Sequence, residues 1–543
     1  MTERIARLRL PGAPASSTCV VLSALALFAC SSDAGRETLD STAGPAPSGV
    51  YDWWIAGGTV IDGTGAPGRA ADVLVRDGRI AYVGPLDEEA ADAIDATHRF
   101  DAAGLVVTPG FIDAHAHADP VEQPTLDNFL AMGVTTIVLG QDGGSPRAED
   151  MAAHLDAVDA AHPGVNVAYL LGHATIRREA GVEYGQPDRE GLVRMAGLVT
   201  AGLREGAFGL STGLEYNPGS LAEMPELVRV AEPVAAVDGV VASHLRSENA
   251  GEVEGALDEL LTQGRESGAR VHVSHIKIVL EDDTAAATAL LARMAAARDS
   301  GMDVTADIYP YTASYTGLSI LFPDWALPPA DYDSVVASRR DDLAAHLRQR
   351  VESRNGPGAT RFGNGEYAGR TLAEVAAGES RPYEDVLIDL GPDGASAAYF
   401  VMDEDVMKRL LVDRHVAISS DGSPTMLHPR GHGAFARVIR RYVVGDSLLT
   451  IEEAVRKMSG FTASIFRLDD PAVVEVPRGR VRTGWAADLL AFDPAEVEDQ
   501  ATFEQPHLLA AGMRGVWVDG EAALLDGEPV AGDGRGRALR ARR

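Results

Sequence analysis

His115 and His117 lie two residues apart at the end of an apolar run that begins at residue 105. Alternate residues of a β-strand point to the same face, so both imidazoles can reach one metal ion at the carboxyl end of that strand. In a loop, the same pair could be solvated or hydrogen-bonded to its neighbours, and the motif alone does not decide between these interpretations. Histidines and acids at the ends of later apolar runs favour the metal site.

Apolar, strand-like runs alternate with alanine-rich helical stretches at a spacing of roughly 30 residues, which is typical of successive βα units. Eight such runs carry polar residues at or just beyond their ends: 105–117, 134–142, 165–173, 207–212, 240–246, 271–277, 304–311 and 416–422. They predict an α/β protein with a closed (β/α)8 barrel, whose chemistry lies at the carboxyl ends of the strands. A doubly wound sheet is the alternative, but polar residues on most strand ends favour closure.

The remaining segments predict a smaller domain and an insertion. Short alternating strands, broken by Gly and Asp-Gly turns, occupy residues 51–108 and 478–535, and we expect both ends to pair into one discontinuous β-sandwich domain. The barrel then takes residues 109–477. The stretch between the seventh and eighth runs is too long for one βα connection, which predicts a lid-like insertion around residues 318–395.

The composition excludes several classes of protein. With 543 residues and 45% hydrophobic content, the chain can bury a large core and is not a disordered protein. Its 80 acidic and 48 basic residues give a net charge of −32, which opposes binding to nucleic acid or to anionic lipid through a basic surface. We therefore expect no nucleic-acid partner.

The first 30 residues resemble the export signal of a bacterial lipoprotein. Three arginines precede an apolar stretch, residues 19–29, that is too short for a permanent transmembrane helix and ends Leu-Phe-Ala-Cys30. We expect a signal peptide at 1–29, lipidation of the Cys30 thiol and a flexible tether at 30–50, which would anchor the protein in the cell envelope facing the periplasm. An ordinary secretory signal or a membrane-anchored terminus is the alternative, and each also exports the protein.

The two cysteines of the chain, Cys19 and Cys30, both lie in this segment. Cleavage would remove the first and lipidation would consume the second, so we expect no disulfide and no thiolate ligand in the mature fold. A metal site must then be built from histidine, carboxylates and water, or from a modified side chain.

Many separate motifs, in the same order, resemble those of one enzyme family. Residues 108–117 resemble the opening metal motif of the amidohydrolase superfamily. Other segments are similar to the D-aminoacylase, or N-acyl-D-amino-acid deacylase, family: 209–216, 243–248, 274–277, 307–311, 420–422, 428–435, 457–460, 484–488 and 499–503. The resemblance covers nearly all of the chain after the tether. It implies a (β/α)8 metal-dependent hydrolase that cleaves the amide bond of an N-acyl-D-amino acid.

The resemblance also implies a set of ligands for one or two zinc ions. His244 and His275 would hold a tightly bound zinc, and His115 and His117 would belong to an adjacent, weakly filled site. Where the family has a cysteine ligand, this chain has Asp142, which we expect to replace it as an oxygen ligand that bridges two metals. The alternative is that this aspartate only caps a glycine-rich turn.

Asp421 matches the catalytic acid of the family and is also counted among the metal ligands. Zinc-bound water titrates near ~7, and Asp421 would take a proton from it and return that proton to the departing amine. An Asp-Gly pair after a strand is commonly just a turn, but its place on the eighth strand favours the catalytic role.

The substrate contacts follow partly from geometry and partly from the resemblance. Lys277 lies two residues after His275 on the same strand face, so we expect it to pair with a substrate carboxylate. Matching motifs imply further substrate-binding or supporting residues: Tyr216, Tyr309, Tyr311, His173 and Arg177. The tyrosines at 309 and 311 could equally pack the barrel. We expect His272 to be structural, and no arginine just after Tyr315 is available to select an acidic substrate.

The expected activity is zinc-dependent hydrolysis of N-acyl-D-amino acids or of related peptides that contain D-residues. A cyclic-amide or dipeptide hydrolase of the same superfamily, similar to dihydroorotase, hydantoinase or isoaspartyl dipeptidase, is the closest alternative. A non-catalytic binding lipoprotein of the envelope is the alternative from another class. The missing cysteine favours that alternative, whereas the four histidines and Asp421 oppose it.

Overall fold

The computed structural model describes residues 48–543. The predicted signal peptide, the lipidation site Cys30 and most of the predicted tether lie outside the described residues. The last predicted tether residues instead begin strand β1 (Gly49–Val60). Over the described range, no helix is both long enough and apolar enough to cross a membrane.

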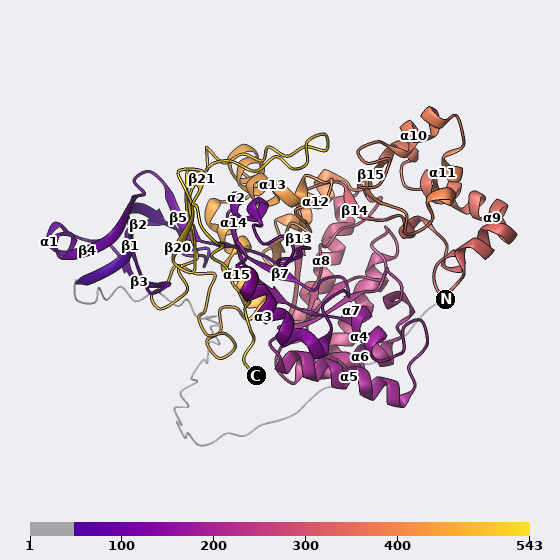
Figure 1. Ribbon diagram of the computed structural model, residues 1–543, viewed down its shortest axis with the longest axis horizontal. Coiled ribbons are helices and arrows are strands. Elements are labelled where there is room, and N and C mark those ends of the chain that lie inside the picture. Colours follow the sequence, from indigo (N-terminus) through magenta and orange to yellow (C-terminus); the bar gives the residue numbers. More distant parts are fainter. Residues whose placement is uncertain (1–47) are drawn as a thin grey trace, which may run out of the picture. The chain divides into compact units, whose positions relative to one another are not determined.

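Within residues 48–543, the eight predicted βα units form a closed barrel of parallel strands (Figure 1). Hydrogen bonds join the strands in two groups: β6 (Phe111–Asp113), β7 (Val134–Leu139) and β8 (Asn166–Tyr169), then β9 (Leu171–Gly172), β10 (Gly209–Gly213), β11 (Val240–His244), β12 (Arg270–Val273), β13 (Val304–Ile308) and β17 (Val416–Ile418). The third barrel strand is β8 and β9 together, interrupted at Leu170.

The first and eighth barrel strands meet through backbone hydrogen bonds. The Asp421 amide donates to the carbonyl of His115 at 2.8 Å, and the His117 amide donates to the carbonyl of Gly422 at 2.8 Å. These contacts close the barrel at the carboxyl ends of β6 and β17. The predicted (β/α)8 fold is confirmed, and the doubly wound alternative is excluded because such a sheet has open edges.

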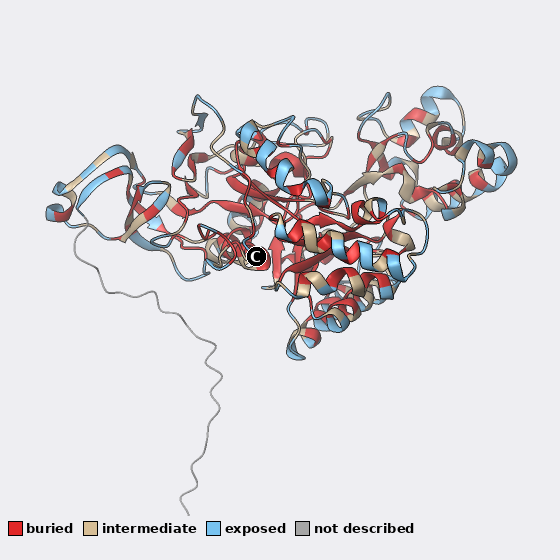
Figure 2. Cartoon of the chain, turned by 60° about the horizontal axis from the view of Figure 1, so that its bottom comes forward, coloured by how far each residue is buried: buried red, intermediate tan, exposed pale blue. Residues whose placement is uncertain are grey.

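Helices cover the outside of the barrel, with one face buried and the other exposed in most of them (Figure 2). They are α2 (Asp127–Ala131), α3 (Met151–Ala161), α4 (His173–Glu179), α5 (Arg189–Arg204), α6 (Met224–Ala235), α7 (Val253–Ser267), α8 (Thr284–Asp299), α12 (Glu404–Leu411), α13 (Arg430–Arg437), α14 (Ile451–Met458) and α15 (Gly460–Phe466). In α5, for example, Met195, Val199 and Leu203 recur every four residues and are buried. This spacing gives one apolar face against the strands.

Strands from the two parts of the chain that flank the barrel form one nine-stranded sheet. It contains β1, β2 (Arg69–Arg76), β3 (Arg79–Gly84), β4 (Ile94–Asp101), β5 (Val106–Pro109), β18 (Leu489–Phe492), β19 (Met513–Val518), β20 (Glu521–Leu525) and β21 (Glu528–Pro529), with α1 (Glu88–Asp92) between β3 and β4. The antiparallel pair β5 and β18 joins the two parts. Trp517 is buried at their common core, edge-on to Trp53 and Phe100. Because β5 runs directly into β6, this sheet holds the entry to the first barrel strand.

The long connection before the eighth barrel strand folds as a unit with its own core. Its strands β14 (Ser314–Gly317), β15 (Thr360–Phe362) and β16 (Ser396–Tyr399) form an antiparallel sheet beside α9 (Tyr332–Glu352), α10 (Leu372–Glu379) and α11 (Tyr383–Leu390). Leu318, Leu343 and Phe362 belong to a hydrophobic cluster separate from that of the barrel. The pairing of β14 with β16 brings both ends of this insertion together at the barrel.

The last residues of the chain return to the barrel, beyond the end predicted for the β domain at residue 535. The Val167 amide donates to the carbonyl of Arg537 at 2.9 Å, and the Leu539 amide donates to the carbonyl of Val167 at 2.7 Å. Residues 536–542 therefore add a short extended segment beside β8.

Candidate metal centre

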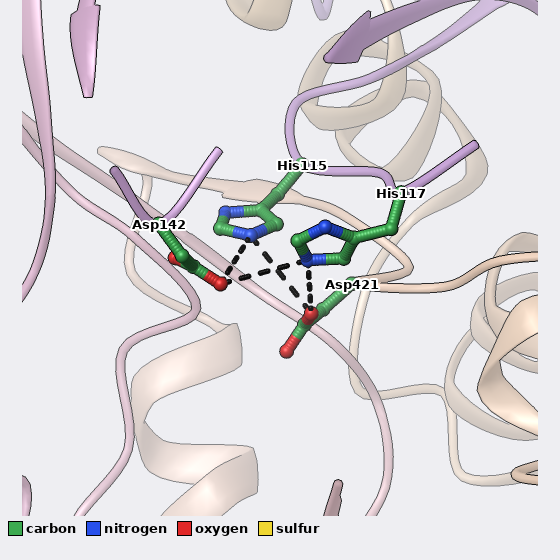
Figure 3. A group of neighbouring side chains, drawn as sticks. All are labelled: His115, His117, Asp142 and Asp421. Atoms are coloured by element: carbon green, nitrogen blue, oxygen red, sulfur yellow. Dashed lines mark ion pairs between the residues drawn. The ribbon is translucent and has the colours of Figure 1, made fainter. Parts of the chain in front are cut away.

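Four side chains from three strand ends converge in front of the barrel (Figure 3). His115 and His117 follow β6, Asp142 follows β7 and Asp421 follows β17. One oxygen of Asp142, Oδ2, lies 3.4 Å from His115 Nε2 and 3.5 Å from His117 Nε2. One oxygen of Asp421, Oδ1, lies 3.2 Å from His117 Nε2 and 3.8 Å from His115 Nε2. The four ligand atoms enclose one point.

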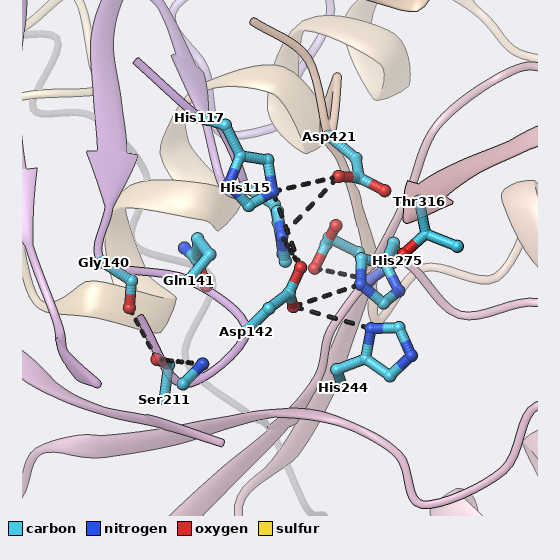
Figure 4. Close-up of polar contacts among 12 residues, drawn as sticks. His115, His117, Gly140, Gln141, Asp142, Ser211, His244, His275, Thr316 and Asp421 are labelled. Carbon is cyan, nitrogen blue, oxygen red and sulfur yellow. Dashed lines mark hydrogen bonds and ion pairs between the residues drawn. The ribbon is translucent and has the colours of Figure 1, made fainter. Parts of the chain in front are cut away.

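A second group shares Asp142 with the first (Figure 4). Its other oxygen, Oδ1, lies 3.3 Å from His275 Nε2 and 3.7 Å from His244 Nδ1, at the ends of β12 and β11. The two carboxylate oxygens of Asp142 thus face different histidine pairs. This is the arrangement of a carboxylate that bridges two neighbouring ions.

The separations between these atoms fit coordination better than direct hydrogen bonding. Ligands held at about 2.0–2.2 Å from zinc in a tetrahedron stand about 3.3–3.6 Å from one another. The nitrogen–oxygen separations in the two groups run from 3.2 to 3.8 Å. Neither ring nitrogen of the fully buried His115 has a hydrogen-bond partner within residues 48–543. A buried polar group without a partner is costly, and an ion between the ligands would satisfy it.

The loop after β7 holds Asp142 in place. Ser211 in β10 donates through its hydroxyl to the carbonyl of Gly140 at 2.6 Å and accepts from the Gly143 amide at 3.1 Å (Figure 4). Gly140 has φ +77°, and a Cβ there would stand 2.1 Å from the carbonyl oxygen of Leu170. Only glycine fits this close approach. The glycine-rich turn therefore delivers the carboxylate of Asp142 to the cluster.

The charges of the cluster favour a cation. Burial alone would lower the pKa of His117 and of His244, but neighbouring carboxylates raise each to about 10. Burial alone would raise the pKa of Asp142, but His115 and His275 hold it well below its ordinary value. The site therefore stabilises added positive charge, which is what a metal-binding site requires.

Carboxylates behind the second group engage the ring nitrogens that face away from Asp142. Glu215 Oε2 lies 3.0 Å from His244 Nε2, and Glu248 Oε1 lies 3.2 Å from His275 Nδ1. Such partners fix the orientation and tautomer of a ligating imidazole. His272 does not face the cluster: its Nε2 lies 2.8 Å from Asp307, as expected of a structural residue.

Asp421 has one oxygen toward the histidines and the other toward an arginine. Its Oδ2 lies 2.8 Å from Arg430 Nη1. Burial alone would raise the pKa of Asp421, but Arg430 and His275 hold it below its ordinary value. The side chain is therefore a carboxylate at neutral pH, the form that accepts a proton.

A cavity of about 510 Å³ opens onto both groups and is large enough for a small substrate. Lys277, Tyr216 and Tyr309 line it, as the predicted substrate contacts should. The Lys277 ammonium already lies 2.5 Å from Glu248 Oε1. Burial alone would lower the pKa of this lysine, but Glu248 raises it.

Three other predicted substrate contacts lie elsewhere, and we correct those predictions. Tyr311 is buried below the cavity lining and donates to the carbonyl of Pro429 at 3.4 Å. His173 and Arg177 are fully buried and both bind Glu226, at 2.7 and 2.6 Å. Their side chains join α4 to α6 and do not reach the cavity. In this chain the segment therefore makes a structural contact in the barrel wall.

The cavity also contains charged residues to which the sequence analysis gave no role. Arg430 and Glu248 lie inside the quoted motifs, so their motif positions were a usable signal. Arg354 follows α9 in the insertion and lies outside the quoted motifs. Only the folded insertion brings it to the cavity.

Comparison with known proteins agrees with this geometry. The amidohydrolase family profile matches residues 99–523. The N-acyl-D-glutamate deacylase of Alcaligenes xylosoxydans xylosoxydans is 37% identical over 509 residues, which cover 89% of this chain and 96% of that protein. The D-aminoacylase of the same organism is 35% identical over 516 residues, which cover 90% and 97%.

A solved structure is similar to this chain in both fold and sequence. The N-acyl-D-glutamate deacylase from Bordetella bronchiseptica, complexed with zinc and a phosphonate inhibitor that mimics the tetrahedral intermediate, matches with a TM-score of 0.78 and 35% identity. The match covers 91% of this chain and 100% of that chain. The chain therefore belongs to the D-aminoacylase family of the amidohydrolase superfamily.

Proposed function

We propose that this protein hydrolyses the amide bond of N-acyl-D-amino acids with one or two zinc ions. The observation that carries the proposal is the position of Asp142, whose two oxygens face the pair His115 and His117 and the pair His244 and His275. A histidine and carboxylate donor set suits zinc and needs no thiolate. Relatives that act on N-acyl-D-glutamate and the zinc in the Bordetella protein support the choice of substrate and metal.

The two histidine pairs and Asp142 would hold the zinc, which would lower the pKa of a bound water and polarise the amide carbonyl. Asp421 accepts the proton of the attacking water through the oxygen that faces the histidines. It then donates this proton to the amide nitrogen as the carbon–nitrogen bond breaks. Arg430 holds the other oxygen of Asp421 and keeps the carboxylate oriented during both transfers.

The test measures zinc content and the hydrolysis of N-acetyl-D-amino acids, their L-enantiomers and a cyclic amide such as dihydroorotate. We expect one or two zinc ions per chain and turnover of the D-series. Asp421→Asn should lower kcat by about 10²- to 10⁴-fold, because the amide cannot take up the proton. Asp119→Asn, an exposed aspartate beyond β6, is the matched control and should leave kcat unchanged. Turnover of only the cyclic amide, or none with zinc bound, would refute the proposal.

We further propose that the protein is an exported lipoprotein, anchored in the envelope through Cys30. The arginines and the short apolar stretch before Cys30 support this. Expression of the full chain in a bacterium, followed by mass spectrometry of the N-terminal peptide, should show cleavage before Cys30 and a lipid on that residue. Cys30→Ser should leave the chain uncleaved at this position. A wild-type peptide that retains residues 1–29 would exclude this route.

A further inference from the structure

We propose that Arg354 binds a second carboxylate of the substrate, beyond the α-carboxylate, and so selects acidic N-acyl-D-amino acids. The inference rests on the proposed deacylase function and adds the residue that decides which substrate is preferred. It starts from a side chain that lines the cavity in front of the metal centre and whose Nε has no hydrogen-bond partner within residues 48–543.

Arg354 is a buried cation that makes no direct ion pair within residues 48–543. Its residue is 2% exposed, and its Nε is buried without a hydrogen-bond partner. Over residues 48–543, no ion pair joins its guanidinium to a carboxylate. Burial and the charge of Arg350, one helical turn earlier, lower the pKa of this arginine, and Tyr399, Glu215 and Glu248 only partly offset that. A buried charge without a direct partner is strongly unfavourable, and a carboxylate bound beside Arg354 would offset this cost.

The acidic side chains of the cavity cannot supply the missing charge, because each is already paired. Glu248 is 2.5 Å from the Lys277 ammonium, and Glu215 is 3.0 Å from His244 Nε2. Asp421 is held by Arg430. Arg354 is therefore the cation in this cavity that remains available to a carboxylate from outside.

The backbone around Arg354 points it at the cavity. The residue follows the end of α9, and Asn355 and Gly356 after it have φ values of +65° and +77°. The Asn355 amide group donates to the carbonyl of Phe400 at 2.9 Å, which ties this turn to the strand β16. The guanidinium lies 5.4 Å from the centre of the Tyr399 ring, so it also contacts the strand β16 of the insertion.

Arginine suits this task because its planar fork can bind a carboxylate through two parallel hydrogen bonds. The second carboxylate can belong to either of two parts of the substrate. It can be on the amino-acid side chain, as in a D-glutamate derivative, or on the acyl group, as in an N-succinyl derivative. Both present the same chemistry to Arg354, and the substrates in the test distinguish them.

The experiment uses zinc-loaded protein and pairs of substrates that differ only in charge. N-acetyl-D-glutamate is compared with N-acetyl-D-glutamine. N-succinyl-D-glutamine is compared with the derivative in which the free carboxylate of the succinyl group is converted to an amide. The wild type should prefer the acidic member of at least one pair. Arg354→Met should lower kcat/KM for that acidic member by about 10- to 100-fold, mainly through KM, and change the neutral member by less than about threefold. Arg354→Lys should restore part of the preference.

Thermal unfolding separates ligand binding from a structural role. Because Arg354→Met removes an unpaired buried charge, the melting temperature should stay the same or rise. Arg340→Met, an exposed arginine of the same helix paired with Asp385, is the control and should leave both substrates unaffected. A lower melting temperature with equal loss for the acidic and neutral members would overturn the proposal.

Failure of the role of Arg354 can be distinguished from failure of the deacylase function. Hydrolysis of all substrates without an acidic preference would refute the role of Arg354 and leave the deacylase function intact. If no substrate is hydrolysed, the deacylase function fails. Calorimetric titration of N-acetyl-D-glutamate and N-acetyl-D-glutamine then still tests Arg354, and equal affinity of the two ligands for the wild type would refute its role.

Discussion

At the scale of single residues, three of the six candidate ligands adopt a strained backbone. Asp142, His275 and Asp421 have φ values of +52°, +36° and +47°. Such conformations cost about 1–3 kcal/mol each and persist where the surroundings enforce them. Hydrogen bonds to neighbouring strands do so here: the His275 amide donates to Asp307 at 3.1 Å, and the Asp421 amide donates to His115 at 2.8 Å. The strain aims the three side chains at one cluster.

Because the two oxygens of Asp142 face different histidine pairs, we predict that replacing this residue removes metal from the site. In Asp142→Asn, one carboxylate oxygen becomes an amide nitrogen that cannot ligate, so zinc content after dialysis should fall to at most one ion per chain. In Asp142→Cys, a thiolate should keep zinc bound at His244 and His275, because sulfur is a strong zinc ligand. Elemental analysis and the rise in melting temperature on adding zinc measure both effects. An Asp142→Asn protein that retains two zinc ions per chain after dialysis would contradict the bridging role.

Lys457 predicts a dependence of stability on pH. It is fully buried in α14, donates to the carbonyls of Asp413 and Val416, and has its pKa lowered to about 7 by burial. Below that pH, both the folded and the unfolded chain carry the proton. Between about pH 7 and the ordinary lysine pKa of 10.5, the unfolded chain binds more protons, so this group makes the free energy of unfolding increase as pH rises.

The measurement compares wild type with Lys457→Met by urea denaturation at several pH values from 7 to 10. Methionine does not titrate, so the stability of the wild type relative to the variant should increase across this range. A difference that stays constant, or that shrinks with rising pH, would show that the folded lysine keeps its ordinary pKa.

At the scale of elements, the barrel was predictable because each strand carries its polar residues at the same end. Buried runs such as β7 and the histidines after β11 and β12 are visible in the sequence. The insertion is visible only as excess length. Arg354 could not be assigned, because its place in the cavity depends on the folding of α9 against β16 and on no local pattern. Conversely, Arg177 fits a family segment, but it points into the barrel wall.

The corrected role of Arg177 predicts a loss of stability without a loss of substrate affinity. Its guanidinium lies 2.6 Å from both oxygens of Glu226, and its Nε donates to the carbonyl of Glu183 at 2.9 Å. Glu226→Gln should therefore leave a buried arginine partly unpaired and lower the free energy of unfolding by about 3–5 kcal/mol. Glu223→Gln, at an exposed position before α6, should have little effect. A raised KM in the folded Glu226→Gln enzyme would instead restore a substrate role.

At the scale of the whole molecule, segments that are distant in sequence pair to form common sheets. The nine-stranded sheet needs β5 and β18, which lie on either side of the entire barrel sequence. Contacts of such high sequence separation form late in folding, because a long loop must close first. The pairing of the two flanking segments was predictable from their alternating strands. The return of residues 536–542 to the barrel was not, because this arginine-rich segment has no apolar periodicity.

That terminal segment predicts the last effect, on stability and not on chemistry. Gly536, Arg537, Leu539 and Ala541 make backbone hydrogen bonds to residues 163–167 and 206, which lie at the amino ends of barrel strands, whereas the metal centre lies at the carboxyl ends. Leu539 is 7% exposed, so Leu539→Ala should cost about 2–5 kcal/mol of unfolding free energy, and Arg540→Ala at most about 1 kcal/mol.

Deletion of residues 536–543 should lower the melting temperature further than Leu539→Ala does, because it also leaves the amide of Val167 and the carbonyl of Gly206 without their partners. Thermal unfolding followed by circular dichroism measures this, and kcat is measured well below the transition. We expect kcat to remain within about twofold of the full chain, because a change at the amino ends of the strands leaves the ligand-bearing loops in place. A truncated protein with a normal melting temperature but a lower kcat would reverse this assignment and place the terminal segment in the catalytic machinery.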